Sequence, residues 1–172
     1  MDSPKLFHPQ NAAVCHVLAV PYPGRGHVNP AMNLCKLLSS LKHDLLITFV
    51  VTEEWLTFMQ NDPKPHNLNF RTIPNVLPSE LVRGSDFAGF YEAVMTKMEA
   101  PFEQLLDQID PPPFIIIADT ELVWAIPAGN RRNIPVASLW TMSASLFWMS
   151  FRYFEPVAPD REKKDSHPNQ IK

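Results

Sequence analysis

The chain has few cysteines and glycines and no excess of charge of one sign. Its 172 residues include 2 cysteines, 5 glycines, 15 basic and 18 acidic residues, with a net charge of −3. Cys15 and Cys35 fit neither a disulfide framework nor a metal site, so we expect both to be small core residues and expect no bound metal. Without a basic stripe interleaved with aromatic residues, a nucleic-acid partner has no support.

Targeting signals and long apolar runs are also missing. The first thirteen residues are polar and have no apolar h-region, so the sequence predicts no secretory signal and a cytoplasmic location. The most apolar stretch, 135–151, is interrupted by serine and threonine and is short for a membrane span of about 20 residues. We expect a flexible N-terminus over 1–13 and a disordered tail over 155–172, where prolines accompany eight charged residues.

Two nucleotide motifs and a hydrolase motif are absent as well. Gly24-Arg25-Gly26 begins like a dinucleotide fingerprint, but Asn29 stands at the third glycine position. No Gly-Lys-Ser/Thr sequence and no Gly-x-Ser-x-Gly elbow occurs. The sequence therefore predicts no tightly bound cofactor.

The chain does contain a regular alternation of strand-like and helical segments. Apolar runs predict strands over 14–20, 44–52, 68–73, 114–118 and 134–139. Helical periodicity predicts helices over 30–41, 53–61, 86–109, 120–131 and 142–154, with Pro101 bending or splitting the third. Strict alternation favours an α/β fold, a Rossmann-like parallel sheet with helices on both faces, in one domain over 14–154.

The segment from His16 to Pro30 is the most informative, because an apolar strand runs into a Gly/Pro turn that ends with a histidine. Pro30 suits the first position of a helix, and Asn29 before it suits the N-cap. We therefore expect His27 at the exit of a strand-turn-helix unit. The carboxyl end of a strand is where open α/β sheets hold their ligands.

Asp119 also follows a strand directly, 92 positions after His27. Carboxyl ends of parallel strands share one edge of the sheet, so the two side chains can meet. A carboxylate bonded to one ring nitrogen sets the tautomer and leaves the other nitrogen free to accept a proton from a hydroxyl. The alternative is that His27 is an ordinary turn histidine and Asp119 an N-cap.

Aromatic residues cluster in the segments around this edge. Phe90, Trp124 and Phe147, with Trp140 and Trp148, can line a pocket for a flat apolar molecule. Packing in the core is the alternative for each of them.

Three segments together resemble the N-terminal half of a plant family-1 UDP-glycosyltransferase. They are Pro-Tyr-Pro-Gly-Arg-Gly-His27-Val-Asn-Pro, the strand that ends in Ala-Asp119-Thr, and Asn-Ile-Pro-Val-Ala-Ser-Leu-Trp-Thr141, and the similarity runs from about 16 to 151. The resemblance implies the GT-B architecture of two Rossmann-like domains, of which this chain supplies the N-terminal acceptor-binding domain. The C-terminal donor-binding domain is absent from the sequence and would be its natural packing partner.

The resemblance also implies a reaction. His27 would be the base that deprotonates a hydroxyl of a small, mostly apolar acceptor, and Asp119 would orient it. The acceptor oxygen would then attack a UDP-sugar co-substrate with inversion, and Thr141 would contact the donor sugar. Phe90, Trp124 and Phe147 would bind the acceptor in a reaction of plant secondary metabolism. Arg25 and Glu121 depart from the residues common in this family.

Two functions remain open at this point. The first is a UDP-sugar-dependent hexosyltransferase, in which this chain is the acceptor half and is inactive by itself. The second is a truncated, non-catalytic product that binds small molecules or another protein. A weaker alternative is an unrelated doubly wound binding domain. Because the face toward a partner domain would be exposed, we expect the isolated chain to aggregate readily.

Overall fold

The computed structural model describes residues 15–42 and 44–154. It divides into two compact units, the first ending at Thr141 and the second beginning at Met142. The predictions for 1–13 and 155–172 lie outside the described residues. The domain boundaries predicted from the sequence stay a prediction.

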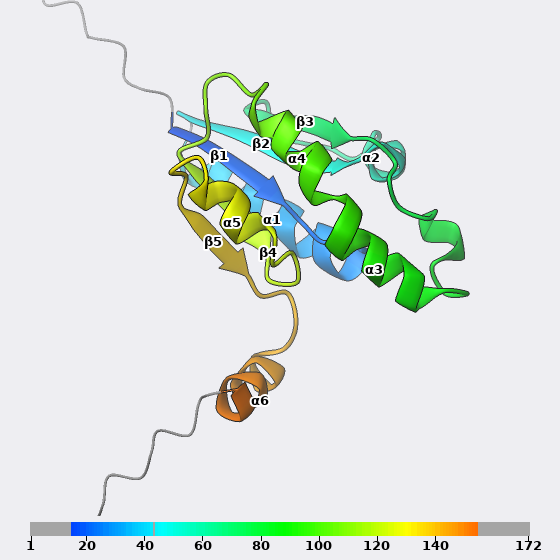
Figure 1. Ribbon diagram of the computed structural model, residues 1–172. Coiled ribbons are helices and arrows are strands. Elements are labelled where there is room, and N and C mark those ends of the chain that lie inside the picture. The colour runs from blue at the N-terminus through cyan, green and yellow to red at the C-terminus, as the bar shows by residue number, and fades with distance from the viewer. Residues whose placement is uncertain (1–14, 43, 155–172) are drawn as a thin grey trace, which may run out of the picture. The chain divides into compact units, whose positions relative to one another are not determined.

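Five parallel strands form the sheet of the first unit, in the order β3-β2-β1-β4-β5. All five strands predicted from the sequence are present (Figure 1), and their bounds are Cys15–Val20 for β1, Leu45–Thr52 for β2, Leu68–Ile73 for β3, Ile115–Asp119 for β4 and Val136–Leu139 for β5. The chain leaves β1 for β2 on one side and later returns to pair β4 on its other side. The carboxyl ends of β1 and β4 therefore flank the topological switch point, where such sheets bind ligands.

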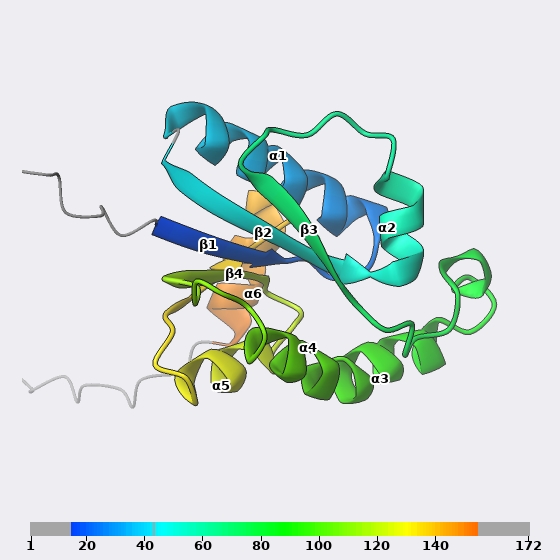
Figure 2. The same ribbon diagram turned by 90° about the horizontal axis from the view of Figure 1, so that it is seen from above.

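Helices cover both faces of this sheet (Figure 2). One face carries α1 (Arg25–Leu41) and α2 (Glu53–Met59), and the other carries α3 (Phe87–Lys97), α4 (Glu99–Leu106) and α5 (Ala125–Asn130). Successive residues of β1 face opposite sides of the sheet, so each side has its own hydrophobic core. Val17 belongs to the core beneath α1 and α2, and Leu18 to the core beneath α3, α4 and α5. The predicted Rossmann-like α/β fold is confirmed.

Two prolines lie near the start of a helix. Pro101 is the third residue of α4, which follows α3 after a break at Met98, so the predicted split is confirmed. Pro127 is likewise the third residue of α5, where a missing amide hydrogen costs no helical hydrogen bond. A helix over 120–131 was predicted, but α5 begins only at Ala125 because turns occupy the residues after Asp119.

The predicted start of the first helix at Pro30, with Asn29 as its N-cap, is wrong. Helix α1 begins at Arg25, so Pro30 lies inside it. The Gly24 carbonyl accepts the amides of His27 at 2.9 Å and Val28 at 2.8 Å, and these bonds form the first turn five residues early. His27 consequently lies within the first helical turn and not after a loop.

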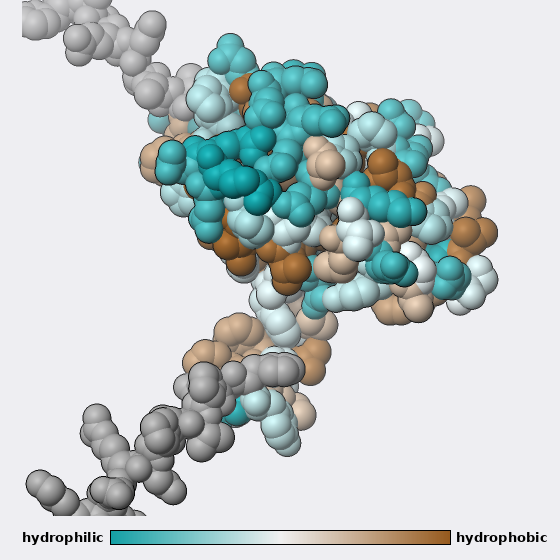
Figure 3. Space-filling view, viewed as in Figure 1, coloured by the Kyte–Doolittle hydropathy of each residue, from teal (hydrophilic) through white to brown (hydrophobic). Residues whose placement is uncertain are grey.

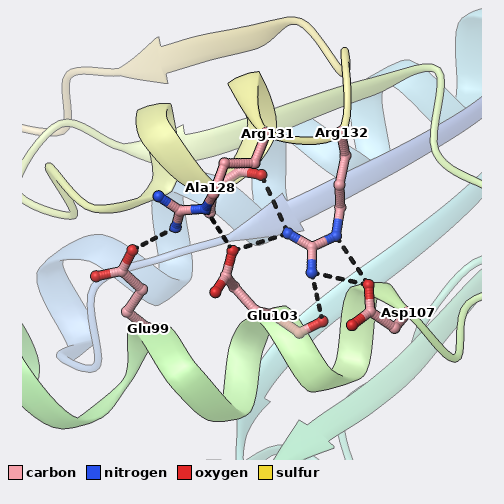
Figure 4. Close-up of polar contacts among 6 residues, drawn as sticks. All are labelled: Glu99, Glu103, Asp107, Ala128, Arg131 and Arg132. Carbon is pink, nitrogen blue, oxygen red and sulfur yellow. Dashed lines mark hydrogen bonds and ion pairs between the residues drawn. The ribbon is translucent and has the colours of Figure 1, made fainter.

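An ion-pair network joins α5 to α4 (Figure 4). Arg132 contacts both Glu103 and Asp107 at 2.8 Å, and Arg131 contacts Glu103 at 2.8 Å and Glu99 at 2.5 Å. Hydrophilic side chains gather on the face that carries α4 and α5 (Figure 3). The network ties the helix that follows β4 to the helix that covers the sheet.

The second unit contains α6 (Ala144–Phe154), two residues shorter at its start than the helix predicted over 142–154. Phe147 stacks on Phe151 with ring centroids 6.3 Å apart, and Arg152 lies 5.4 Å from the Trp148 ring. In the described part of the chain, we find no helix of the length and apolarity that crossing a bilayer requires.

Candidate functional site

His27 and Asp119 meet at the carboxyl edge of the sheet, as the sequence predicts. The Nδ1 atom of His27 lies 2.8 Å from Oδ2 of Asp119. His27 comes from the first turn of α1, and Asp119 is the last residue of β4, the strand beside β1. The carboxylate side chain is 1% exposed and the imidazole 24% exposed, so the pair is buried on one side and open on the other.

Asp119 is held in place by a second hydrogen bond. Its Oδ1 accepts the backbone amide of Glu121 at 3.1 Å, while its Oδ2 faces His27. A carboxylate accepts hydrogen bonds and does not donate them, so Nδ1 of His27 carries the proton. Nε2 then has the lone pair, and it makes no hydrogen bond within the described residues. The arrangement supplies a proton acceptor with a set tautomer.

Thr141 reaches the same ring nitrogen, a contact that the sequence reasoning did not anticipate. Its Oγ1 lies 2.9 Å from Nδ1 of His27. Because Nδ1 donates, the threonine oxygen accepts a share of that hydrogen bond and keeps its own proton free to donate. The position of Thr141, two residues after β5, could be expected from the parallel sheet, but its side-chain direction could not. Its contact with a donor sugar stays a prediction.

The three aromatic residues predicted to bind the acceptor lie in different surroundings. Phe90 is 1% exposed on α3, with its ring 6.3 Å from that of Tyr22. Trp124 is 4% exposed, donates its indole N–H to the Val94 carbonyl at 3.1 Å and packs 5.2 Å from Phe102. Phe147 belongs to the second unit. Acceptor binding by these residues stays a prediction, and Phe90 and Trp124 also pack the core.

The sequence reasoning missed a group of residues beside His27. The Tyr22 ring lies 5.0 Å from the imidazole, at an angle of 46°. Arg83 donates to the Pro23 carbonyl at 3.3 Å and pairs with Glu80 at 3.0 Å. The one available signal was Tyr22 itself, an aromatic residue in the turn between the first strand and the first helix.

His16 is a buried histidine with both ring nitrogens hydrogen-bonded, and it provides a comparison for His27. It is 1% exposed, and both ring nitrogens are engaged, Nδ1 with the Pro111 carbonyl at 2.6 Å and Nε2 with the Thr48 hydroxyl at 2.8 Å. Burial lowers the pKa of His16. His27 differs because its Nε2, on a partly exposed ring, makes no hydrogen bond to any residue that the structure describes. No cluster of metal-ligating side chains occurs among the residues the structure describes.

The chain is similar in sequence to plant UDP-glycosyltransferases, although no family model matches it. It is 60% identical over 132 residues to UDP-glycosyltransferase 87A2 of Arabidopsis thaliana, covering 76% of this chain and 29% of that relative. Identity to UDP-glycosyltransferase 87A1 of Arabidopsis thaliana is 51% over 154 residues, 85% of this chain and 35% of the relative. The chain thus spans about a third of the length of these relatives.

Solved structures share the fold. LpCGTa in complex with UDP superposes with a TM-score of 0.63 at 24% identity, over 82% of this chain and 34% of that structure. UGT89C1 of Arabidopsis thaliana with UDP-L-rhamnose gives a TM-score of 0.65 at 18% identity, over 86% of this chain and 40% of that structure. The solved structures show that the chain shares their fold, and the sequence similarity over most of the chain shows that it belongs to the plant family-1 UDP-glycosyltransferases.

Proposed function

We propose that the chain is the acceptor-binding part of an inverting UDP-sugar-dependent glycosyltransferase with His27 as the general base. The observation that carries the proposal is the hydrogen bond between Nδ1 of His27 and Asp119, which leaves Nε2 able to accept a proton. The acceptor is a small, mostly apolar molecule with a hydroxyl group. Phe90, Trp124 and Phe147 contribute to its binding, and Thr141 contacts the donor sugar.

The proposed reaction has one proton transfer and one displacement. The acceptor hydroxyl gives its proton to Nε2 of His27 while its oxygen forms a bond to the anomeric carbon of the sugar. The bond from that carbon to the UDP oxygen breaks, and UDP leaves from the opposite face, which inverts the configuration. Asp119 stabilises the imidazolium that forms, because its Oδ2 accepts the Nδ1 proton at 2.8 Å. No step requires a metal.

The relatives support this substrate class by their names. One relative that is 33% identical over 143 residues is a 7-deoxyloganetin glucosyltransferase of Catharanthus roseus, and the solved neighbours hold UDP or UDP-L-rhamnose. The chain spans about a third of the length of these relatives. UDP-sugar binding is therefore proposed for a longer protein, in which this chain is joined to a segment like the unmatched two thirds of the relatives. A cytoplasmic location belongs to the same proposal.

A chimera tests the proposal. The segment of UDP-glycosyltransferase 87A2 that matches this chain is replaced by the chain, and UDP release is measured with a hydroxylated aromatic acceptor. His27→Ala is expected to lower kcat by about two to four orders of magnitude, the usual contribution of a general base. His66→Ala is the matched control, because His66 is exposed and precedes β3 at the other edge of the sheet.

Equal rates for wild type and His27→Ala would refute the assignment of the base. UDP-sugar turnover by the 172-residue chain itself would exclude the non-catalytic alternative.

A further inference from the structure

A buried polar atom beside the proposed base, the Tyr22 hydroxyl, has no hydrogen-bond partner among the described residues, and Tyr22 is only 5% exposed. Oε2 of Glu80, which pairs through its other oxygen with Arg83, is also buried without a partner there. A third such atom, the indole nitrogen of Trp55, lies in the other core. Leaving a buried donor or acceptor unpaired is costly, and such groups in native proteins call for an explanation.

The Tyr22 ring is packed beside His27. Its centroid lies 5.0 Å from the imidazole and 6.3 Å from the Phe90 ring. A Cβ at Gly24 would be 3.7 Å from both the Tyr22 ring and the His27 ring. Tyr22 is therefore a buried, packed side chain that contacts the proposed base.

Arg83 is the charged neighbour of this hydroxyl. Its side chain is 31% exposed, its Nη1 would lie 2.8 Å from a Cβ at Gly24, and its guanidinium is 5.6 Å from the Phe90 ring. Displacing the guanidinium breaks the 3.3 Å bond to the Pro23 carbonyl, the partly exposed pair with Glu80 and the contact with the Phe90 ring.

We propose that Tyr22 is a specificity-determining residue whose hydroxyl bonds a second, uncharged oxygen of the acceptor while the reacting hydroxyl lies at His27. This inference rests on the proposed function and narrows its substrate class to apolar acceptors with at least two oxygen substituents. An acceptor with a single hydroxyl leaves the Tyr22 hydroxyl unpaired, so it binds less tightly.

The charges around Tyr22 favour a neutral oxygen over a carboxylate. Arg83, Glu80 and Glu121 all act on the Tyr22 hydroxyl, so two negative groups face one positive group there. Burial raises the pKa of Tyr22 to about 12, with Arg83 opposing that rise. The hydroxyl thus remains protonated at neutral pH and can donate to an acceptor oxygen.

Binding to the chimera in the absence of any UDP-sugar tests the inference without catalysis. Calorimetry compares 2-naphthol, which has one hydroxyl, with the 2,6- and 2,7-dihydroxynaphthalenes. One net hydrogen bond predicts that the isomer with the matching spacing binds wild type about three- to tenfold more tightly than 2-naphthol. In Tyr22→Phe this preference is expected to vanish while 2-naphthol binds as before. Tyr91→Phe, the same change at a neighbouring residue that is 41% exposed, is expected to keep the preference.

The possible outcomes distinguish a failure of the Tyr22 assignment from a failure of the proposed acceptor site. If 2-naphthol binds but neither dihydroxynaphthalene binds more tightly, or if Tyr22→Phe retains the preference, the role of Tyr22 is refuted and acceptor binding stands. If wild type binds none of the three probes, the acceptor site itself is refuted. Thermal unfolding of Tyr22→Phe checks that the variant is folded, and its Tm should equal or exceed that of wild type because an unpaired hydroxyl has been removed.

Discussion

Replacing Asp119 with asparagine should reverse the tautomer of His27. The side chain keeps its shape, and the backbone amide of Glu121 donates to Oδ1 of Asp119 at 3.1 Å. In Asp119→Asn this amide holds the carbonyl oxygen of the new side chain in the same place. The NH₂ group then occupies the position of Oδ2, 2.8 Å from Nδ1 of His27. Two donors cannot face each other, so the ring proton moves to Nε2.

The size of the effect follows from this geometry. With a proton on Nε2, the nitrogen that faces the acceptor can no longer accept one, and general-base catalysis is lost, a contribution of about 10² to 10⁴ in rate. In serine proteases, the same change at the aspartate that orients the catalytic histidine lowers kcat about 10⁴-fold. Thr141, 2.9 Å from Nδ1, still offers the original tautomer a weaker acceptor. We expect kcat of the chimera to fall about 10²- to 10⁴-fold.

Two measurements check this prediction. ¹⁵N NMR of the chimera labelled at histidine reports directly which ring nitrogen of His27 carries the proton, and UDP release by the same chimera gives kcat. Asp107→Asn is the matched control, because Asp107 is 65% exposed and pairs with Arg132 away from the site. A proton that remains on Nδ1 in Asp119→Asn, or a loss of kcat below about tenfold, would refute the reasoning.

Three further predictions concern stability. Burial lowers the pKa of His16, so the unfolded chain binds more protons than the folded chain below about pH 6.5. The free energy of unfolding should therefore fall as the pH drops through that range, and it should fall less in His16→Gln. Gly129→Ala places a Cβ 2.8 Å from the Ile134 carbonyl oxygen and should lower the free energy of unfolding by about 1–3 kcal/mol. The Cβ of Gly26→Ala meets no atom within 4 Å, so this change should raise the free energy of unfolding by about 0.5–1 kcal/mol. Arg132→Ala removes ion pairs at partly exposed groups and should cost about 1 kcal/mol or less, with a smaller cost at high salt.

Denaturant titrations of each variant beside wild type decide these three cases. A pH-independent wild type would contradict the assignment for His16. Equal changes in the free energy of unfolding for Gly129→Ala and Gly26→Ala would mean that the close approach of Gly129 in α5 to Ile134 does not limit stability. A cost at Arg132 that does not change with salt would show that the network is not mainly electrostatic.

Strands were easier to predict than helix ends, for a physical reason. A strand buried on both faces is a continuous apolar run, and β2, which has this pattern, ends at the predicted residue Thr52. The edge strand β3 is partly exposed along its length and also ends where predicted, at Ile73. A helix can begin wherever a carbonyl accepts the first amides, and the Gly24 carbonyl does so before the apolar periodicity begins. Residues 25–29 lack that periodicity, so the preference of proline for the first helical position and of asparagine for the N-cap assigned the start to Pro30.

The sequence by itself determined that His27 and Asp119 can meet, because each follows a strand in a parallel sheet and such strands end at one edge. Tertiary structure alone decided the rest of the site. Placing β4 beside β1 brought the two side chains to 2.8 Å and let Thr141 reach the same nitrogen at 2.9 Å. It also buried the Tyr22 hydroxyl without a hydrogen-bond partner in the part of the chain that the structure describes. Local patterns encode where a strand ends, whereas hydrogen-bond partners from distant segments depend on how the strands are ordered and packed.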